Sequence, residues 1–415
     1  MSVSYGFLST SPPTQCGLAT FNQALFQHLA VGADTGGLVR VVDDPTDLRG
    51  ANTVAHLVGG SRLSMLGAVS ALNRFDVAIV QHEYGIYAGS DGEQVLDVLT
   101  RLRVPVIVVL HTVLGAPTPH QRSVLERIAD AADAVVVMSN TAASRLFDGY
   151  AIDATKVIAI SHGAPPLYAS ADAVPGAFAS RTRPTILTWG LMGPGKGLEW
   201  MIDAMGRLRD LDPAPRYLIA GQTHPKVLER EGEAYRTSLM NRAEALGVSS
   251  MVQFDSSYRD TPSLLRLVHG VDVVVLPYDS SEQTTSGVLI EAVAALRPVV
   301  ATRFPHACEL LANGSGLLVG HRDPVGLADA LRRVLTEPGV AAQMSAASAR
   351  IAPDLTWHAV AGRYRELAAG LLAARSARGI LAGAGSIAGS TVAPIGVTAG
   401  VPATVQASVP VGVPA

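Results

Sequence analysis

Short apolar segments alternate with longer segments of helical periodicity along most of the chain. The apolar segments are rich in Val and Ile and end at Gly, Pro or Asn. Such alternation is typical of β–α units on a parallel sheet, because consecutive parallel strands are joined by a crossover helix. The predicted strands are 3–8, 39–42, 54–57, 77–81, 106–110, 134–138 and 157–160, followed by 185–189, 216–220, 251–254, 271–277, 299–302 and 316–319.

The pattern lapses once, at 164–184, where Pro, Ala, Ser and Gly dominate. Helices are expected at 19–29, 92–102 and 121–132 before the lapse, and at 198–208, 226–246, 262–269, 288–295 and 324–336 after it. The sequence therefore predicts an α/β protein with two doubly wound, Rossmann-like domains facing across a cleft. The predicted parts are an N-terminal domain at 1–165, a linker at 166–184, a C-terminal domain at 185–355 and a closing helix at 356–378 that returns towards the N-terminal domain.

The last segment, 379–415, has no charged and no aromatic residue. We expect it to be a disordered Ala/Gly/Pro/Val tail, because it lacks the side chains that bury enough apolar surface to fold.

Composition raises the question of a membrane protein. Of 415 residues, 48% are hydrophobic and 16% are charged, against about a quarter charged in an average soluble protein, and the mean hydropathy is +0.28. No continuous apolar run approaches the roughly 20 residues that a spanning helix needs. The N-terminus has no basic residue before Arg40 and no continuous apolar segment, which argues against a secretory signal. A cytoplasmic location is expected, and contact with the inner face of a membrane stays open as an alternative.

Charge and cysteine content exclude further classes. Residues 1–180 hold 10 basic and 15 acidic residues, and the remainder holds 22 and 20, so no nucleic-acid partner is expected. Cys16 and Cys308 are far apart in the sequence and indicate neither a disulfide framework nor a zinc site. Histidine and carboxylate motifs with metal-ligand spacing are also missing, so no metal site is predicted.

Ligands of open parallel sheets bind beyond the carboxyl ends of the strands, where helix N-termini present free N–H groups to anions. The loop after the first strand, 9–21, places Gly17 directly before a helical segment. Glycine at this point lets the backbone approach a ligand closely. A tight turn explains it equally well.

The loop after the strand at 185–189 reads WGLMGPGKG and leads into a helix. It combines four glycines, among them Gly190 and Gly195, with Lys196, one of three lysines in the chain. A cation beside a helix N-terminus favours a phosphate or diphosphate site. The spacing matches neither the Walker A loop nor GxGxxG, and a turn without ligand is the alternative.

A third loop, 278–287, precedes the helix that contains Glu291. Hydroxyl and backbone N–H groups of its last residues can donate to phosphate, and the carboxylate of Glu291 can hold both hydroxyls of a ribose. A solvated acid at a helix start is the alternative for Glu291.

In the first half, strand ends carry His82, Glu83, Tyr84, His111 and His162, and a functional role is favoured for them because the strands themselves are apolar.

Taken in order, these motifs resemble the family-4 glycosyltransferases, retaining enzymes of GT-B fold that use nucleotide-sugar donors. The resemblance covers about residues 3–375. It rests on the Gly17 loop, His111, the loop from Gly190 to Gly197, the segment from Gln283 to Glu291, and the run GSGLLV at 314–319.

The resemblance implies a metal-independent transfer of a sugar from a nucleotide-diphosphate donor to a hydroxyl acceptor, with retention of configuration and without a cofactor. Partners would be the nucleotide sugar and a carbohydrate, lipid-linked or small-molecule acceptor. The implied catalytic residues are Lys196, His111 and Glu291. The implied donor-binding residues are Gly17, Gly190, Gly195, Lys196, Gln283, Thr285, Ser286, Gly287, Val288 and Glu291. The implied acceptor- or sugar-facing residues are His82, Glu83, Tyr84, His111 and His162.

Two positions depart from the family pattern. Leu191 stands where the family usually has an arginine, and Gln283 stands where it has the first of two glutamates, with Glu282 offset by one. Glutamine can still accept and donate hydrogen bonds to sugar hydroxyls. The alternatives left open are a catalytically impaired nucleotide-sugar-binding protein and a GT-B sugar-nucleotide epimerase.

Overall fold

The computed structural model describes residues 2–44, 46–47, 50–166, 183–257 and 259–385. Both sheets, and the helices as far as residue 372, belong to one compact unit, Met1–Leu372. The predicted linker falls almost wholly on residues outside this description, and so does the predicted tail from residue 386 onward.

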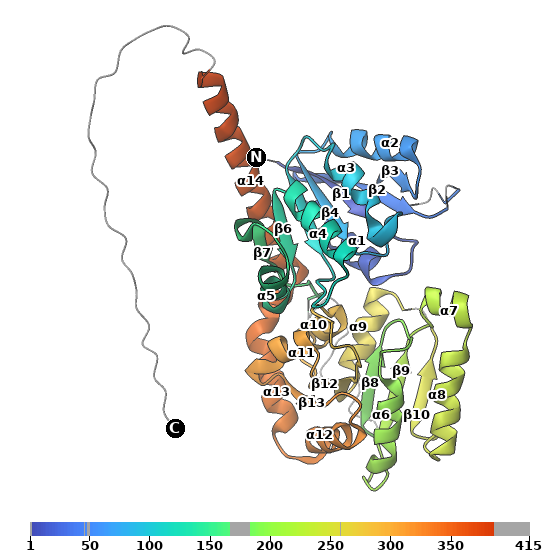
Figure 1. The fold of residues 1–415 in the computed structure, drawn as a ribbon. Coiled ribbons are helices and arrows are strands. Elements are labelled where there is room, and N and C mark those ends of the chain that lie inside the picture. The colour runs from blue at the N-terminus through green and yellow to red at the C-terminus, as the bar shows by residue number, and fades with distance from the viewer. Residues whose placement is uncertain (1, 45, 48–49, 167–182, 258, 386–415) are drawn as a thin grey trace, which may run out of the picture. The chain divides into compact units, whose positions relative to one another are not determined.

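The first sheet is parallel and has the order β3-β2-β1-β4-β5-β6-β7 (Figure 1). The chain enters at β1 in the middle, winds outward to β3 and then returns to the other side through β4, which is the doubly wound topology predicted from the sequence. The strands are β1 (Ser4–Ser9), β2 (Thr35–Val42), β3 (Thr53–Val58), β4 (Val77–His82), β5 (Val106–Leu110), β6 (Ala134–Val137) and β7 (Val157–Ala159).

The second sheet repeats the plan with the order β10-β9-β8-β11-β12-β13, again all parallel. Its central strand pair, β8 and β11, marks the point where the winding direction reverses, so the loops after these strands are the expected ligand site. The strands are β8 (Thr185–Trp189), β9 (Arg216–Ala220), β10 (Val252–Asp255), β11 (Val273–Leu276), β12 (Val299–Thr302) and β13 (Gly316–Val319).

Helices flank both sheets, and many of them begin at a polar cap. Thr118 and Gln121 form a reciprocal capping box at α4, and Asp323 caps α12. The helices are α1 (Gly17–Leu29), α2 (Arg62–Leu72), α3 (Gln94–Leu99), α4 (Pro119–Ala131), α5 (Asn140–Gly149), α6 (Leu198–Met205), α7 (Pro225–Glu231), α8 (Ala234–Ala245), α9 (Thr261–His269), α10 (Gly287–Ala294), α11 (Pro305–Leu310), α12 (Pro324–Thr336), α13 (Val340–Ile351) and α14 (Trp357–Gly385). Short 3₁₀ turns lie at Ser90–Gly92, Ala154–Lys156, Gly206–Leu208, Leu311–Asn313 and Ala352–Leu355.

Alternating strand residues supply a core on each face of each sheet. In β1, Leu8 faces the core under α2, α3 and α4, whereas Phe7 faces the core under α1. The start of α14 packs into this second core, where Trp357 and Tyr364 are buried beside Phe21. The first turns of the closing helix therefore cover this face of the first sheet.

Three features differ from the sequence-based prediction. The helix expected at 226–246 is two helices, α7 and α8, because Gly232 ends α7 with a φ of 59°. The closing helix extends to Gly385, so residues 379–385 belong to α14 and not to a disordered tail. Helices α2, α5, α11 and α13 were not predicted. No helix within the described ranges is both long and apolar enough to cross a bilayer.

Candidate functional site

The glycine-rich loop after β8 is held in place by the loop after β11. Gly197 begins α6 with a φ of 64°, and a Cβ on it would lie 1.8 Å from the carbonyl oxygen of Pro277. The backbone N–H of Asp279 donates to the carbonyl of Gly195 over 3.0 Å. The two loops at the switch point of the second sheet thus form one structure, and part of the glycine content is required by that packing.

Lys196 extends from this loop over an aromatic ring. Its Nζ lies 4.3 Å from the centroid of Tyr278, which stacks on Phe304. Within the described ranges no carboxylate pairs with this ammonium group. A cation–π contact leaves the three N–H donors of the ammonium largely available, so Lys196 can bind an anion without first breaking an ion pair.

A second lysine stands near the same loop. The backbone N–H of Met192 donates to Gln222 and that of His224 donates to Met192, both over 2.8 Å, which joins the two strand-end loops. Burial, followed by the positive charges of Lys226 and Lys196, lowers the pKa of His224. Lys226 Nζ also donates to the carbonyl of Gly85 in the first half, over 3.4 Å. Two of the three lysines therefore contribute positive potential here, a clustering that the sequence did not indicate.

The segment before α10 is ordered by its own polar groups. Ser286 caps the helix, its Oγ accepting from the N–H of Leu289 over 3.3 Å. The N–H of Ser286 donates to Nδ1 of His306 over 2.8 Å, and burial lowers the pKa of His306 to about 4. The side-chain amide of Gln283 donates to the carbonyl of Thr285 over 3.1 Å. The side chain of Gln283 is thus partly used within its own loop.

Glu291 lies one turn into α10 and is half-buried. The indole N–H of Trp189 donates to its Oε2 over 3.3 Å, and burial raises the pKa of the carboxyl to about 7. A fully solvated acid at a helix start would not have this environment. The side chain is adjacent to the glycine-rich loop, because Trp189 precedes Gly190 directly.

Histidines from the first half meet the start of α10. A Cβ on Gly287 would lie 2.8 Å from Nε2 of His162, so only glycine fits against this ring. His162 Nδ1 donates to the carbonyl of Gly163 over 2.6 Å, and burial lowers its pKa to about 4. The unprotonated Nε2 therefore faces the N-terminus of α10. Phe21 joins this group, its ring lying 5.0 Å from His162 and 4.8 Å from His111.

His111 is held by Gln81, whose side-chain oxygen accepts from Nε2 over 2.7 Å. Burial lowers the pKa of His111 to about 3, so the ring is neutral at pH 7. Glu83 accepts from Thr112 over 2.5 Å and from the N–H of Tyr84 over 3.0 Å, and burial raises its pKa.

His82 is fully buried against the Tyr84 ring. This burial leaves His82 without an exposed atom for a ligand.

Gly17 opens α1 and is exposed. No atom lies within 4 Å of the position that a Cβ would take, and its φ lies outside the left-handed region. The fold thus does not require glycine here.

The loop before α1 is shaped by Arg40, a buried residue of β2 that donates to the carbonyl oxygen of Ser11 over 3.1 Å and to Oγ1 of Thr14 over 2.9 Å. The sequence signal for Arg40 is a charged residue inside an apolar strand, which was not among the predicted site residues.

The described residues contain no group of three His, Cys, Asp or Glu side chains arranged to hold a metal ion.

Comparison with known proteins assigns the second half of the chain. Residues 183–337 match the sequence model of the family described as Glycosyl transferases group 1. These residues form a group 1 glycosyltransferase domain. The domain contains the glycine-rich loop, Lys196, the segment 283–288 and Glu291.

Curated relatives share this domain. The chain is 33% identical over 184 residues to a glycogen synthase from Mycobacterium tuberculosis, covering 44% of this chain and 41% of that protein. It is 29% identical over 285 residues to a D-inositol 3-phosphate glycosyltransferase from Salinispora tropica, covering 62% of this chain and 57% of the relative. The chain thus spans about half the length of these relatives.

Solved structures resemble nearly the whole fold. HepE from Anabaena in complex with UDP gives a TM-score of 0.69 at 17% identity and covers 89% of this chain and 100% of that chain. At this identity the likeness shows the fold alone, which confirms the GT-B architecture around the group 1 glycosyltransferase domain.

Proposed function

We propose that the protein transfers a sugar from a nucleotide-diphosphate donor to a hydroxyl group of an acceptor, with retention of configuration and without a metal ion. The observation that carries this proposal is the convergence of the Lys196 loop, the N-terminus of α10 and Glu291 within a group 1 glycosyltransferase domain. Retention rests on the family-4 resemblance.

In such a reaction the bond between the anomeric carbon and the donor phosphate breaks, and its electron pair passes to the diphosphate. The acceptor oxygen forms the new bond to the anomeric carbon, and its proton passes to the departing phosphate. The ammonium of Lys196 and the free N–H groups at the start of α10 suit the stabilisation of the developing negative charge. Glu291 would hold the ribose hydroxyls, and the neutral rings of His111 and His162 would face the sugar or the acceptor.

The position of Gly17 at the start of α1 supports the same assignment. Glycine opens α1 although neither backbone conformation nor packing demands it. A diphosphate approaching the first N–H groups of α1 would account for the lack of a side chain.

The test is donor turnover by Lys196→Ala. We expect kcat/KM to fall by about 100- to 1000-fold, the usual effect of removing one group that stabilises transition-state charge. Released nucleotide is measured with a panel of UDP, GDP and ADP sugars.

Lys156→Ala is the matched control. Its Nζ donates to the carbonyl of Asp130 over 2.9 Å, in the first half of the chain, so turnover should match the wild type. Equal turnover by Lys196→Ala and wild-type protein would refute the assignment.

A nucleotide-sugar-binding protein without catalysis is the second candidate, and two observations favour testing it. Leu191 supplies no cation, and the amide of Gln283 is engaged with Thr285. Such a protein would bind one donor saturably in calorimetry and release no nucleotide.

A further inference from the structure

Helix α5 of the first half contacts the loop that leads into α10. Ser139, the residue that caps α5, donates from Oγ to the carbonyl of Thr284 over 2.7 Å, and both side chains are buried. This contact joins residues 145 positions apart. Thr284 lies between Gln283 and Thr285, two of the predicted donor-binding residues.

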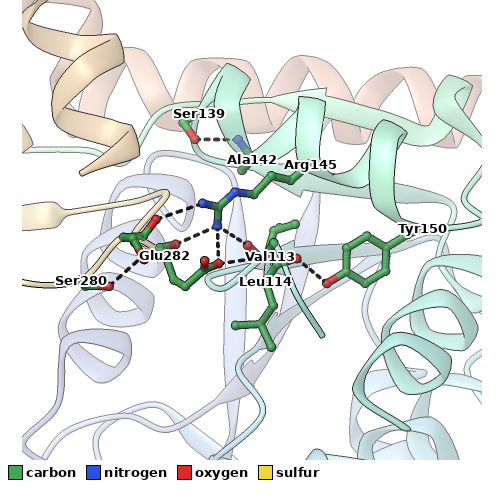
Figure 2. Close-up of polar contacts among 10 residues, drawn as sticks. Val113, Leu114, Ser139, Ala142, Arg145, Tyr150, Ser280 and Glu282 are labelled. Atoms are coloured by element: carbon green, nitrogen blue, oxygen red, sulfur yellow. Dashed lines mark hydrogen bonds and ion pairs between the residues drawn. The ribbon is translucent and has the colours of Figure 1, made fainter. Parts of the chain in front are cut away.

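Arg145, nearly two turns further along α5, binds the same loop more extensively (Figure 2). Its Nη1 donates to the carbonyl of Glu282 and to Oε2 of the same residue, each over 2.9 Å, and its Nη2 donates to the carbonyl of Ser281 over 3.2 Å. Nη1 also donates to Val113 over 3.0 Å. The guanidinium thus holds the loop after β5 and the loop before α10 together.

One oxygen of the Glu282 carboxylate, Oε2, takes part in this arrangement. Besides Arg145, its Oε2 accepts from the backbone N–H of Gly115 over 2.8 Å. The side chain of Arg145 is 18% exposed and that of Glu282 is 47% exposed, so the guanidinium is shielded while the carboxylate stays open to solvent on one side. Oε2 of Glu282 therefore points at Arg145 and Gly115 of the first half.

The start of α5 is anchored separately. Glu309 of α11 accepts from the backbone N–H groups of Asn140 and Thr141, each over 2.8 Å. A carboxylate on the first free N–H groups of a helix also interacts favourably with the helix dipole. Helix α5 is therefore fixed to the second half by Glu309 while Ser139 and Arg145 hold 281–284.

We propose that Arg145 is a positioning residue that orders 281–288 from the opposite half of the chain, so that donor affinity depends on its contacts. Ten residues without regular structure, 277–286, connect β11 to α10. Ordering them only when the donor binds would lower affinity, because lost backbone freedom opposes binding. Arg145 orders part of this loop beforehand. The expected effect of Arg145 on donor affinity rests on the proposed function, whereas its effect on the order of 281–288 does not.

The structural consequence is tested by amide hydrogen exchange of the full chain without ligand. In Arg145→Met, amides of 281–288 should exchange at least tenfold faster than in the wild type. In Glu282→Gln the increase should be smaller, because the three carbonyl acceptors of Arg145 remain. Arg127→Met is the matched control, since Arg127 is an exposed arginine of α4, and its exchange should equal that of the wild type. Exchange within twofold of the wild type in Arg145→Met overturns the proposal.

The kinetic consequence separates positioning from a general loss of structure. With the donor identified, Arg145→Met should raise the donor KM about tenfold and leave kcat within threefold. Arg145→Lys should restore only part of the affinity, because one ammonium group cannot reach all four acceptors. Faster exchange with an unchanged KM overturns the role in donor affinity. A wild-type protein that neither binds nor turns over a nucleotide sugar contradicts the proposed function instead, and hydrogen exchange still decides whether Arg145 orders the segment.

Discussion

At the scale of single residues, Glu291 has an unusual environment for a carboxyl group. It is half-buried, receives one hydrogen bond from Trp189, and has a pKa raised by burial to about 7. The carboxyl therefore changes its charge near neutral pH. An ionised carboxylate accepts both hydroxyls of a ribose, whereas the protonated form has less capacity to accept.

Donor affinity should follow this titration. Between pH 6 and pH 8 the ionised fraction of a group with a pKa of about 7 rises about tenfold, so the donor KM of the wild type should fall by up to that factor. Glu291→Gln should show a higher KM with little dependence on pH. The measurement is donor KM at pH 6, 7 and 8, and a variant that keeps the wild-type pH dependence would show that another group titrates.

The site residues that could be predicted from the sequence differ from those that could not in how far along the chain their interaction partners lie. Lys196 and Glu291 stand out because they interrupt apolar or glycine-rich segments locally. Arg145 and Glu309 do not, because their meaning depends on partners 137 and 168 positions away. Their polar side chains on predicted surface positions are indistinguishable from solvated charges until the fold brings the partners together.

At the scale of elements, the strands were predictable with nearly correct bounds. Strands β5, β8, β9, β12 and β13 have the predicted limits, because buried parallel strands are continuous apolar runs that end at polar or turn residues. The missed helix α5 is short and buries only Ala142 and Leu146, so its apolar stripe is too brief to stand out in the sequence. The single helix expected at 226–246 was wrong because Gly232 permits a left-handed backbone within a segment of helical composition.

The starts of α1 and α6 should respond in opposite ways to alanine. Gly17→Ala should leave the melting temperature unchanged or slightly higher, since a Cβ has space at this position and alanine favours the helix by up to about 1 kcal/mol. The same substitution should raise the donor KM. Gly197→Ala should destabilise the protein, because the added Cβ meets the Pro277 carbonyl and the left-handed backbone disfavours it by about 1–2 kcal/mol. Thermal unfolding and donor KM of both variants test this. An unchanged KM in Gly17→Ala would remove α1 from the donor site.

At the scale of the whole molecule, four neutral histidines, two of them buried and two half-buried, couple stability to pH. His82, His162 and His306 have pKa values lowered by burial to about 4, and His111 to about 3. In the unfolded chain a histidine binds a proton near pH 6.5. The unfolded state therefore binds more protons than the native state from about pH 6.5 down to about pH 4, and stability is lost as the pH falls through this window.

His82 allows this coupling to be measured without touching exposed chemistry, because its ring is fully buried and neither ring nitrogen has a hydrogen-bond partner among the described residues. Between pH 7 and pH 5 one such histidine should lower the free energy of unfolding by about 2 kcal/mol. His82→Leu should therefore lose less stability over this interval than the wild type by about that amount, as measured by denaturant unfolding at both pH values. Circular dichroism at pH 7 checks that the variant keeps the native fold. An equal loss in both proteins would mean that the native structure admits a proton to His82, and the acid sensitivity would then belong to the three histidines that meet near the start of α10.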